Sequence, residues 1–210
     1  MASGEVTRRL AAIVAADVAG YSRLVAADEE ATLSALRACR KELIDPKIAE
    51  YRGRVANTAG DSILIEFPSV IEALRCAIDV QQGMAERNAQ LPEDRRIHFR
   101  VGLNLGDVVD QDGDLLGDGV NVAARLEGLA EPGGICISRA ARDQVRDRLD
   151  VALEDLGEVE VKNIPRPVRA FRVLANGVST TVRPRRHRSP KRPIVLAALA
   201  LAIVAIGGLL

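Results

Sequence analysis

The sequence predicts an α+β domain followed by a transmembrane helix, and three observations lead to this prediction. Apolar runs of strand length, either continuous or alternating, occur at residues 10–16, 62–67 and 97–105. Segments with helical periodicity separate these runs. The 17 residues from 194 to 210 contain no charged side chain, which is typical of a helix inside a membrane.

The first predicted strand is buried and ends in a carboxylate. Residues 10–16 are all apolar, Asp17 follows them, and residues 18–22 form a turn rich in small residues. Residues 28–51 then show helical periodicity, although we expect Pro46 to kink or break that helix. A helical connection therefore follows the first strand.

A tight hairpin is predicted next. Its strands are residues 54–58 and 62–67, and the turn between them carries Asp61 at its tip. Ser69 and Glu72 then have the spacing of a capping box that starts a second helix. A second helical connection therefore follows the hairpin.

Strict alternation of apolar and polar residues at 97–105 predicts a half-buried strand. The resulting order is βαββαβ, the split βαβ unit of ferredoxin-like folds, in which helices cover one face of an antiparallel sheet. This order places the end of the first strand beside the hairpin. We therefore expect Asp17 and Asp61 to meet at the same edge of the sheet.

Two carboxylates held together repel each other unless a proton or a cation lies between them, and oxygen-only ligation suits a pair of Mg²⁺ ions. The alternative is that Asp17 and Asp61 are turn residues that accept hydrogen bonds from backbone amides; their spacing favours neither interpretation. Further along, Asn121 and Arg125 lie four residues apart on a predicted helix and project from one face. Taken alone, that pair also fits a solvated helix face.

Composition excludes several classes of function. An aromatic content of 2% with no tryptophan argues against stacking on nucleic-acid bases, so we expect no nucleic-acid partner. The three cysteines are widely separated and form no C-x-x-C pair, so they are interpreted as buried thiols. Two histidines are too few for a histidine-based metal site or catalytic triad.

Charge is distributed unevenly along the chain. Six of the 29 basic residues lie between positions 183 and 192, whereas all 29 acidic residues precede that block. The basic, proline-containing segment 176–193 is typical of a juxtamembrane linker at the cytoplasmic leaflet. We therefore expect segment 194–210 to form a single-pass helix in the cell inner membrane, with the preceding domain in the cytoplasm. The alternative for 194–210 is a core helix, which would normally show a polar stripe.

Five motifs, taken in order, resemble the catalytic domain of class III adenylyl and guanylyl cyclases. They are AAIVAADVAGYSRL, NTAGDSILIEF, VGLNLGDVV, GDGVNVAARLEGLAEPGGICIS and GEVEVKNIPRPVRAFRV. The resemblance covers residues 8–175, and its most specific part is the V-N-x-A-x-R block that follows an aspartate strand and a Gly-Asp hairpin. It implies a nucleotide cyclase that forms a cyclic nucleotide and pyrophosphate.

The resemblance implies a metal-binding half of the active site. Asp17 and Asp61 match the aspartates that hold two Mg²⁺ or Mn²⁺ ions, with the carbonyl of Val18 as an additional ligand. Gly20 and Ser22 lie in the turn whose small residues let backbone amides approach the phosphates.

The resemblance also implies a substrate-orienting half. Asn121 matches the asparagine that orients the ribose, Arg125 the arginine that stabilises charge on the α-phosphate, and Lys162 the lysine that holds the β- and γ-phosphates. Asp114 matches the acidic residue that recognises the base, whereas its usual lysine partner is replaced by Asn57. We expect ATP as the substrate, and the amide of Asn57 leaves GTP as an alternative.

In this family the two halves of a site come from different chains, so the resemblance implies a homodimer with two equivalent sites at its interface. The departure at Asn57 also motivates a second hypothesis, a non-catalytic module that binds a nucleotide or dimerises. A diguanylate cyclase is disfavoured, because its hairpin carries Gly-Gly-Asp/Glu-Glu-Phe and this turn reads Ala-Gly-Asp-Ser-Ile.

Overall fold

The computed structural model describes residues 7–111, 113–160 and 167–182, with only the backbone described for Thr7 and for residues 175–182. Lys162 and the predicted membrane segment 194–210 therefore lie outside the described residues. Among the helices that are described, none is long and apolar enough to cross a membrane.

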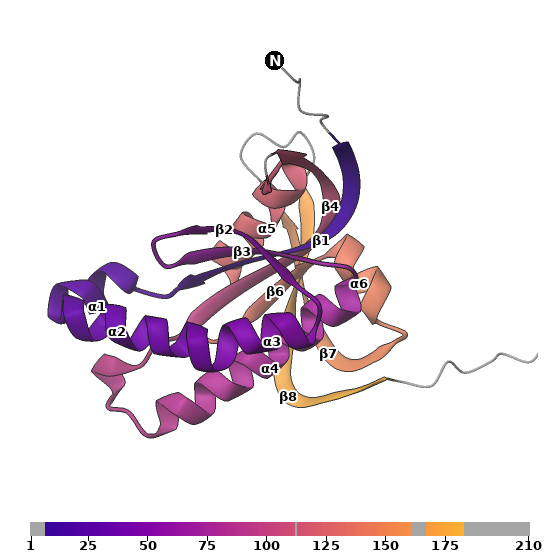
Figure 1. Ribbon diagram of the computed structural model, residues 1–210. Coiled ribbons are helices and arrows are strands. Elements are labelled where there is room, and N and C mark those ends of the chain that lie inside the picture. Colours follow the sequence, from indigo (N-terminus) through magenta and orange to yellow (C-terminus); the bar gives the residue numbers. More distant parts are fainter. Residues whose placement is uncertain (1–6, 112, 161–166, 183–210) are drawn as a thin grey trace, which may run out of the picture.

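One mixed sheet organises the fold (Figure 1). Its order is β2 (Arg54–Ala59), β3 (Ser62–Phe67), β1 (Thr7–Val18), β4 (Phe99–Gln111), β6 (Ile135–Ser138), β8 (Val168–Val182) and β7 (Leu149–Val159), and β5 (Asp114–Leu116) pairs with β4. The first four strands have the expected ferredoxin-like order. The expectation of a purely antiparallel sheet is wrong, because β6 pairs with β4 in parallel. The chain returns to β6 through a helical crossover, which parallel pairing requires.

Helices cover both faces of this sheet, so the expectation of helices on one face is also wrong. The helical segments are α1 (Tyr21–Ala27), α2 (Glu29–Cys39), the π-helix η1 (Arg40–Ile44), α3 (Asp45–Glu50), α4 (Val70–Ala89), the 3-10 helix η2 (Glu93–Arg95), α5 (Asp118–Leu129) and α6 (Arg139–Val145). Alternate residues of β1 show the two faces: Ala12 and Val14 pack with residues of α4 in the main core, whereas Ile13 packs with Ala123 of α5. Because side chains of a strand alternate in direction, α5 lies on the face opposite to α4.

The predicted helix at 28–51 is divided into α2, η1 and α3. Pro46 lies in the first turn of α3, where a missing backbone N–H costs little, and the π-helix precedes it. The predicted capping box is confirmed, since the Ser69 hydroxyl accepts a hydrogen bond of 3.2 Å from the Glu72 amide. The second helical connection therefore begins where the sequence predicts.

The alternating segment forms the first half of β4. Phe99, Val101 and Leu103 are buried in the main core as expected. Asn104 on the opposite face is also buried, because α5 covers that face, and its amide donates to the carbonyl of Gly119 at 3.0 Å. Polar character in the pattern therefore marks a buried hydrogen bond here and not a solvated face.

The three cysteines are free and buried, as the sequence predicts: Cys39, Cys76 and Cys136. Burial raises the pKa of Cys76 to about 12 and that of Cys136 to about 11. These thiols are therefore protonated near neutral pH and belong to the core.

Candidate active site

The carboxylate of Asp17 lies near the end of β1, directly opposite Arg100 in the β1–β4 register. Arg100 donates to both oxygens of this carboxylate, from Nε to Oδ1 at 2.9 Å and from Nη2 to Oδ2. Hydrogen bonding to Asp17 is the main reason that the pKa of Arg100 lies above its usual value. The side chain of Asp17 is only 17% exposed, so the guanidinium compensates a charge that is largely removed from water.

Asp61 reaches the same place from the turn between β2 and β3. Gly60 has φ of 62°, a left-handed conformation that glycine adopts without steric cost. Asp61 Oδ2 then accepts a hydrogen bond of 3.1 Å from the backbone amide of Val18. The structure therefore brings the hairpin tip to the end of β1, where Asp17 lies. The same bond is what a purely structural turn aspartate would make.

A third carboxylate, Glu127 of α5, joins these two. Its Oε1 lies 3.5 Å from Arg100 Nη2. Burial, followed by a hydrogen bond with Asp17 and by the negative charges of Asp17 and Asp61, raises the pKa of Glu127 to about 8, while Arg100 opposes the rise. Asp17 and Glu127 thus contact one guanidinium, and Asp61 lies near enough to interact with it through its charge. We call Asp17, Asp61, Arg100 and Glu127 the carboxylate cluster, and its excess of negative charge favours a cation or a proton.

The donors around this cluster fit Mg²⁺ or Mn²⁺. The carboxylates of Asp17 and Asp61 are hard oxygen ligands, and Mg²⁺ usually binds one or two carboxylates together with substrate phosphates. Within the described residues, no group of three or more His, Cys, Asp or Glu side chains is arranged so that these side chains alone could hold a metal ion. A site of this kind would therefore be completed by oxygens other than those of carboxylates.

The turn after β1 leads directly from Asp17 into α1. The Ala19 amide donates to the carbonyl of His98 at 2.8 Å, which ties the turn to the start of β4. Gly20 caps α1 with φ of 68°, and Ser22 is exposed in its first turn. Gly20 thus lies in the turn and Ser22 at the start of α1, and the backbone before them is held by the bonds of Val18 to Asp61 and of Ala19 to His98.

The two predicted base-recognition residues meet. Asn57 of β2 donates from Nδ2 to Asp114 Oδ2 at 3.0 Å, although 57 positions separate them. The other oxygen of Asp114 accepts from the amide of Leu115 at 2.8 Å. A carboxylate accepts and does not donate, so this contact directs the amide nitrogen of Asn57 toward Asp114.

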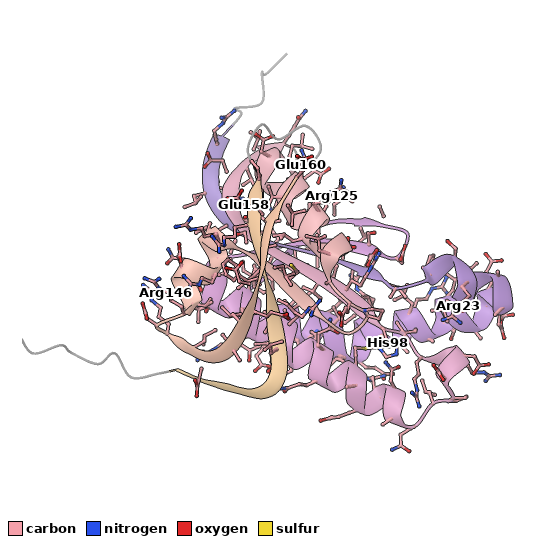
Figure 2. All side chains as sticks on the ribbon, turned by 180° about the vertical axis from the view of Figure 1, so that it is seen from behind. Arg23, His98, Arg125, Arg146, Glu158 and Glu160 are labelled. Carbon is pink, nitrogen blue, oxygen red and sulfur yellow. The ribbon has the colours of Figure 1, made fainter. Side chains whose placement is uncertain are left out.

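Asn121 and Arg125 are exposed on α5, and Figure 2 shows Arg125 at the outer surface of the fold. Val122, Ala123 and Leu126 of the same helix are buried. Glu127 of the same helix interacts with Asp17. The helix α5 therefore contributes to the carboxylate cluster with Glu127 and exposes Asn121 and Arg125 to solvent. A single chain therefore does not bring the two predicted halves together.

Two residues of the carboxylate cluster, Arg100 and Glu127, were not predicted from the sequence. Arg100 could have been found by pairing the first strand with the strand at 97–105, because that register places it opposite Asp17. Glu127 depends on how closely α5 approaches the sheet. Gly102 of β4 permits this approach, since a Cβ there would collide with the carbonyl of Ala123 and the amide of Glu127.

The sequence of the chain is similar to those of known nucleotide cyclases. The family described as "Adenylate and Guanylate cyclase catalytic domain" matches residues 7–175. "Putative adenylate cyclase 3" of Rhizobium meliloti (strain 1021) is 52% identical over 171 residues, which are 81% of this chain and 29% of that protein. The chain therefore spans less than a third of the length of this relative.

Solved structures are similar as well. The crystal structure of an adenylate/guanylate cyclase/hydrolase from Silicibacter pomeroyi is 46% identical, with a TM-score of 0.77, and the match covers 81% of this chain and 99% of that one. The adenylyl cyclase CyaB from P. aeruginosa is 24% identical, with a TM-score of 0.70 over 81% of this chain and 96% of that one. At that identity the second structure supports the fold alone.

Proposed function

The chain belongs to the adenylate and guanylate cyclase catalytic domain family, and from this premise we propose that it converts ATP to 3′,5′-cyclic AMP and pyrophosphate. The observation that carries the proposal is the carboxylate cluster, in which Asp61 is held at the end of β1 beside Asp17. In this proposal the ribose 3′-hydroxyl attacks the α-phosphate in line with the leaving pyrophosphate. The cyclic AMP that is formed serves in intracellular signalling.

The residues of the metal half would hold the metal ions and orient the triphosphate. Asp17, Asp61 and the carbonyl of Val18 would hold two Mg²⁺ or Mn²⁺ ions, which lower the pKa of the 3′-hydroxyl and offset phosphate charge. The turn at Gly20 and Ser22 binds phosphate oxygens through its backbone amides. These groups bring the attacking oxygen and the α-phosphate into reach of each other.

The residues of the other half act on the ribose and on the developing charge. Asn121 orients the ribose, and Arg125 stabilises negative charge on the α-phosphate as the transition state forms. Lys162 holds the β- and γ-phosphates. Because Asn121 and Arg125 point away from the carboxylate cluster of their own chain, we infer that two chains form a homodimer with two shared sites.

Adenine recognition rests on Asn57 and Asp114. Asp114 accepts from the exocyclic amino group of adenine, and the amide of Asn57 donates its second hydrogen to a ring nitrogen. The 52% identity to a protein named as an adenylate cyclase supports ATP. GTP is the alternative substrate, because a rotated amide presents its oxygen to guanine.

Turnover by the purified full chain tests the proposal. We expect cyclic AMP from ATP with Mn²⁺ or Mg²⁺, and a loss of about 10³-fold or more in Asp61→Ala, since metal-ion stabilisation is worth several kcal/mol. Asp147→Ala is the matched control, because Asp147 is an exposed carboxylate paired with Arg146. Nucleotide binding and dimerisation without product would instead support the non-catalytic module, and product unchanged in Asp61→Ala would contradict the metal assignment.

We infer in addition that residues 194–210 anchor the chain in the inner membrane, with residues 1–182 in the cytoplasm. The support comes from the uncharged segment and the basic block before it. Membrane fractionation of the full chain and of a chain lacking residues 194–210 tests this inference. Equal distribution of the two would contradict it.

A further inference from the structure

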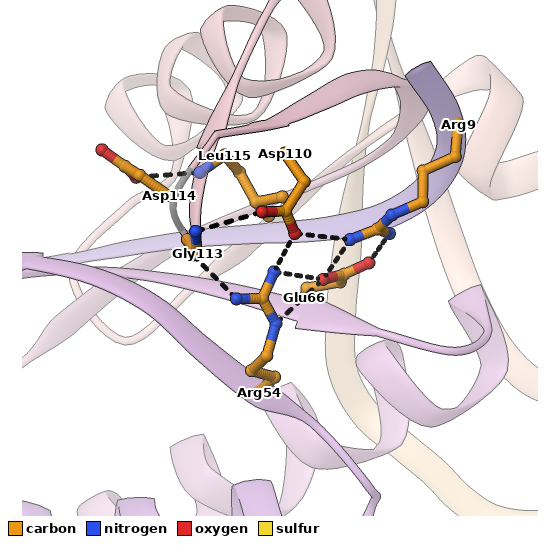
Figure 3. A network of polar contacts seen from close by, with 7 residues as sticks. All are labelled: Arg9, Arg54, Glu66, Asp110, Gly113, Asp114 and Leu115. Atoms are coloured by element: carbon orange, nitrogen blue, oxygen red, sulfur yellow. Dashed lines mark hydrogen bonds and ion pairs between the residues drawn. The ribbon is translucent and has the colours of Figure 1, made fainter. Parts of the chain in front are cut away.

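Four charged side chains, one from each of four strands, form a closed network (Figure 3). Arg54 of β2 donates from Nη2 to Glu66 of β3 at 2.8 Å and to Asp110 of β4 at 3.1 Å. Arg9 of β1 donates from Nη2 to the same two carboxylates at 2.9 Å and 3.3 Å. Two guanidiniums thus alternate with two carboxylates, so the network is neutral.

This network extends to the turn between β4 and β5. Arg54 Nη1 donates to the carbonyl of Gly113 at 2.7 Å, and the amide of Gly113 donates to Asp110 Oδ1 at 3.1 Å. Both backbone groups of Gly113 are therefore held by the network. Gly113 has φ of 88°, so the turn also takes a conformation that few other residues adopt. Asp114, the predicted base-recognition residue, follows immediately.

Arg54 also precedes the other base-recognition residue by three positions. A bulge between Val55 and Asn57 interrupts the β2–β3 register there and redirects the side chains that follow. In the described sheet, β2 and β5 are not paired with each other, so no ladder of backbone hydrogen bonds directly joins the strands that carry Asn57 and Asp114. Side-chain contacts join them, and Arg54 makes one of these: it belongs to β2 and donates to the carbonyl of Gly113, next to Asp114.

We infer that Arg54 is a positioning residue for base selection: its guanidinium holds the Gly113 turn so that Asp114 meets Asn57. The inference rests on the proposed function, since selection between adenine and guanine has meaning only for a nucleotide site. Discrimination between bases depends on hydrogen bonds of fixed geometry, and a displacement of about 1 Å can cost a factor of 10². Arg54 itself touches neither base nor phosphate in this scheme.

The test compares Arg54→Met with Arg52→Met in the full chain. Arg52 forms a comparable ion pair with Glu72 on the helical side and does not contact the turn. We measure the dissociation constants of 3′-deoxy-ATP and 3′-deoxy-GTP, which lack the attacking hydroxyl and are not cyclised. We expect Arg54→Met to reduce the preference between the two nucleotides by about tenfold, while Arg52→Met retains it.

Two further variants separate positioning from a general loss of structure. Arg54→Lys keeps the charge without the fork of donors, so it should restore only part of the preference. If Arg54 acts through the pair it positions, Arg54→Met should change the preference little further in an Asn57→Ala background. A preference unchanged within about twofold in Arg54→Met, or full additivity with Asn57→Ala, would overturn the inference.

Failure of this inference is distinguishable from failure of the proposed function. If the wild-type chain binds the 3′-deoxy nucleotides selectively but makes no cyclic nucleotide from ATP or GTP, the cyclase activity is contradicted. The comparison of Arg54→Met with Arg52→Met then still applies. A wild-type chain that binds neither nucleotide overturns both.

Discussion

The β2–β3 hairpin serves two regions of the molecule that differ in their balance of charge. Its tip brings Asp61 to the carboxylate cluster, which holds three carboxylates and one guanidinium and in which the Glu127 side chain is 13% exposed. Its open end carries Arg54, where two guanidiniums face two carboxylates and the Arg54 side chain is 43% exposed. The carboxylate cluster is partly buried and has excess negative charge, so it favours a cation. The network around Arg54 is neutral and fixes the positions of the strands and the turn that it joins.

The difference in charge balance suits the two ends of the hairpin to different roles. An isolated ion pair at the surface is screened by water and contributes little net stability, but a neutral network of several charges can restrict geometry at little electrostatic cost. A cluster with excess negative charge is unfavourable until a counter-charge arrives. We therefore expect changes at the tip to alter the rate of reaction, and changes at the open end to alter the choice of base.

The largest expected effect comes from separating the two halves of the site in different chains. Asp17→Ala and Arg125→Ala should each lose activity, the second by about 10²–10³, as is typical when a preorganised donor is removed. When the two variants are mixed, each heterodimer retains one site with both groups intact. Activity should therefore recover toward half of the wild-type value per heterodimer, measured after purification with two different affinity tags.

Arg146→Ala in place of Arg125→Ala is the control for this experiment, because Arg146 is an exposed arginine that pairs with Asp147 and belongs to neither predicted half. That variant should be active alone. Heterodimers of the Asp17 and Arg125 variants that remain inactive would show that each site is built within one chain, and would contradict the comparison between the two faces of α5.

Local patterns predicted much of the fold. The hairpin, the capping box and the buried face of β4 follow from alternation and spacing at particular residues, such as Ser69 with Glu72. The parallel pairing of β6 and the position of α5 on the second face did not follow, because both depend on how distant segments pack. Asn104 illustrates the problem: a polar residue in an alternating strand indicated solvent, yet it is buried beneath α5.

The candidate site was predictable where topology alone brings residues together. Placing the first strand beside the hairpin was enough to expect Asp61 near Asp17. Arg100 and Glu127 required the strand register and the depth at which α5 packs, which spacing along the chain does not contain. The Arg54 network joins four strands, and only the three-dimensional structure shows that its members meet.

A smaller effect is expected from Gly102→Ala, which should disturb the carboxylate cluster and leave the network around Arg54 unchanged. Gly102→Ala would place a methyl group against the backbone of Ala123 and Glu127, so α5 must move away from β4. Overpacking of this kind costs about 1–3 kcal/mol in the free energy of unfolding, and the shift displaces Glu127 from Asp17. We expect a lower Tm and a lower rate, but an unchanged preference for ATP over GTP, because Asn57 and Asp114 do not contact this part of α5.

Gly128→Ala is the matched control for that prediction, because it lies on the same helix and a Cβ there meets no atom within 4 Å. Alanine is the better helix former by about 1 kcal/mol, so this variant should be as stable as the wild type or more stable. Thermal denaturation and the ATP-to-GTP ratio of kcat/KM are measured for both variants. If Gly102→Ala changed the base preference as strongly as the rate, the two ends of the hairpin would be coupled through α5. The proposed division, in which the tip with Asp61 affects the rate and the open end with Arg54 affects the choice of base, would then be wrong.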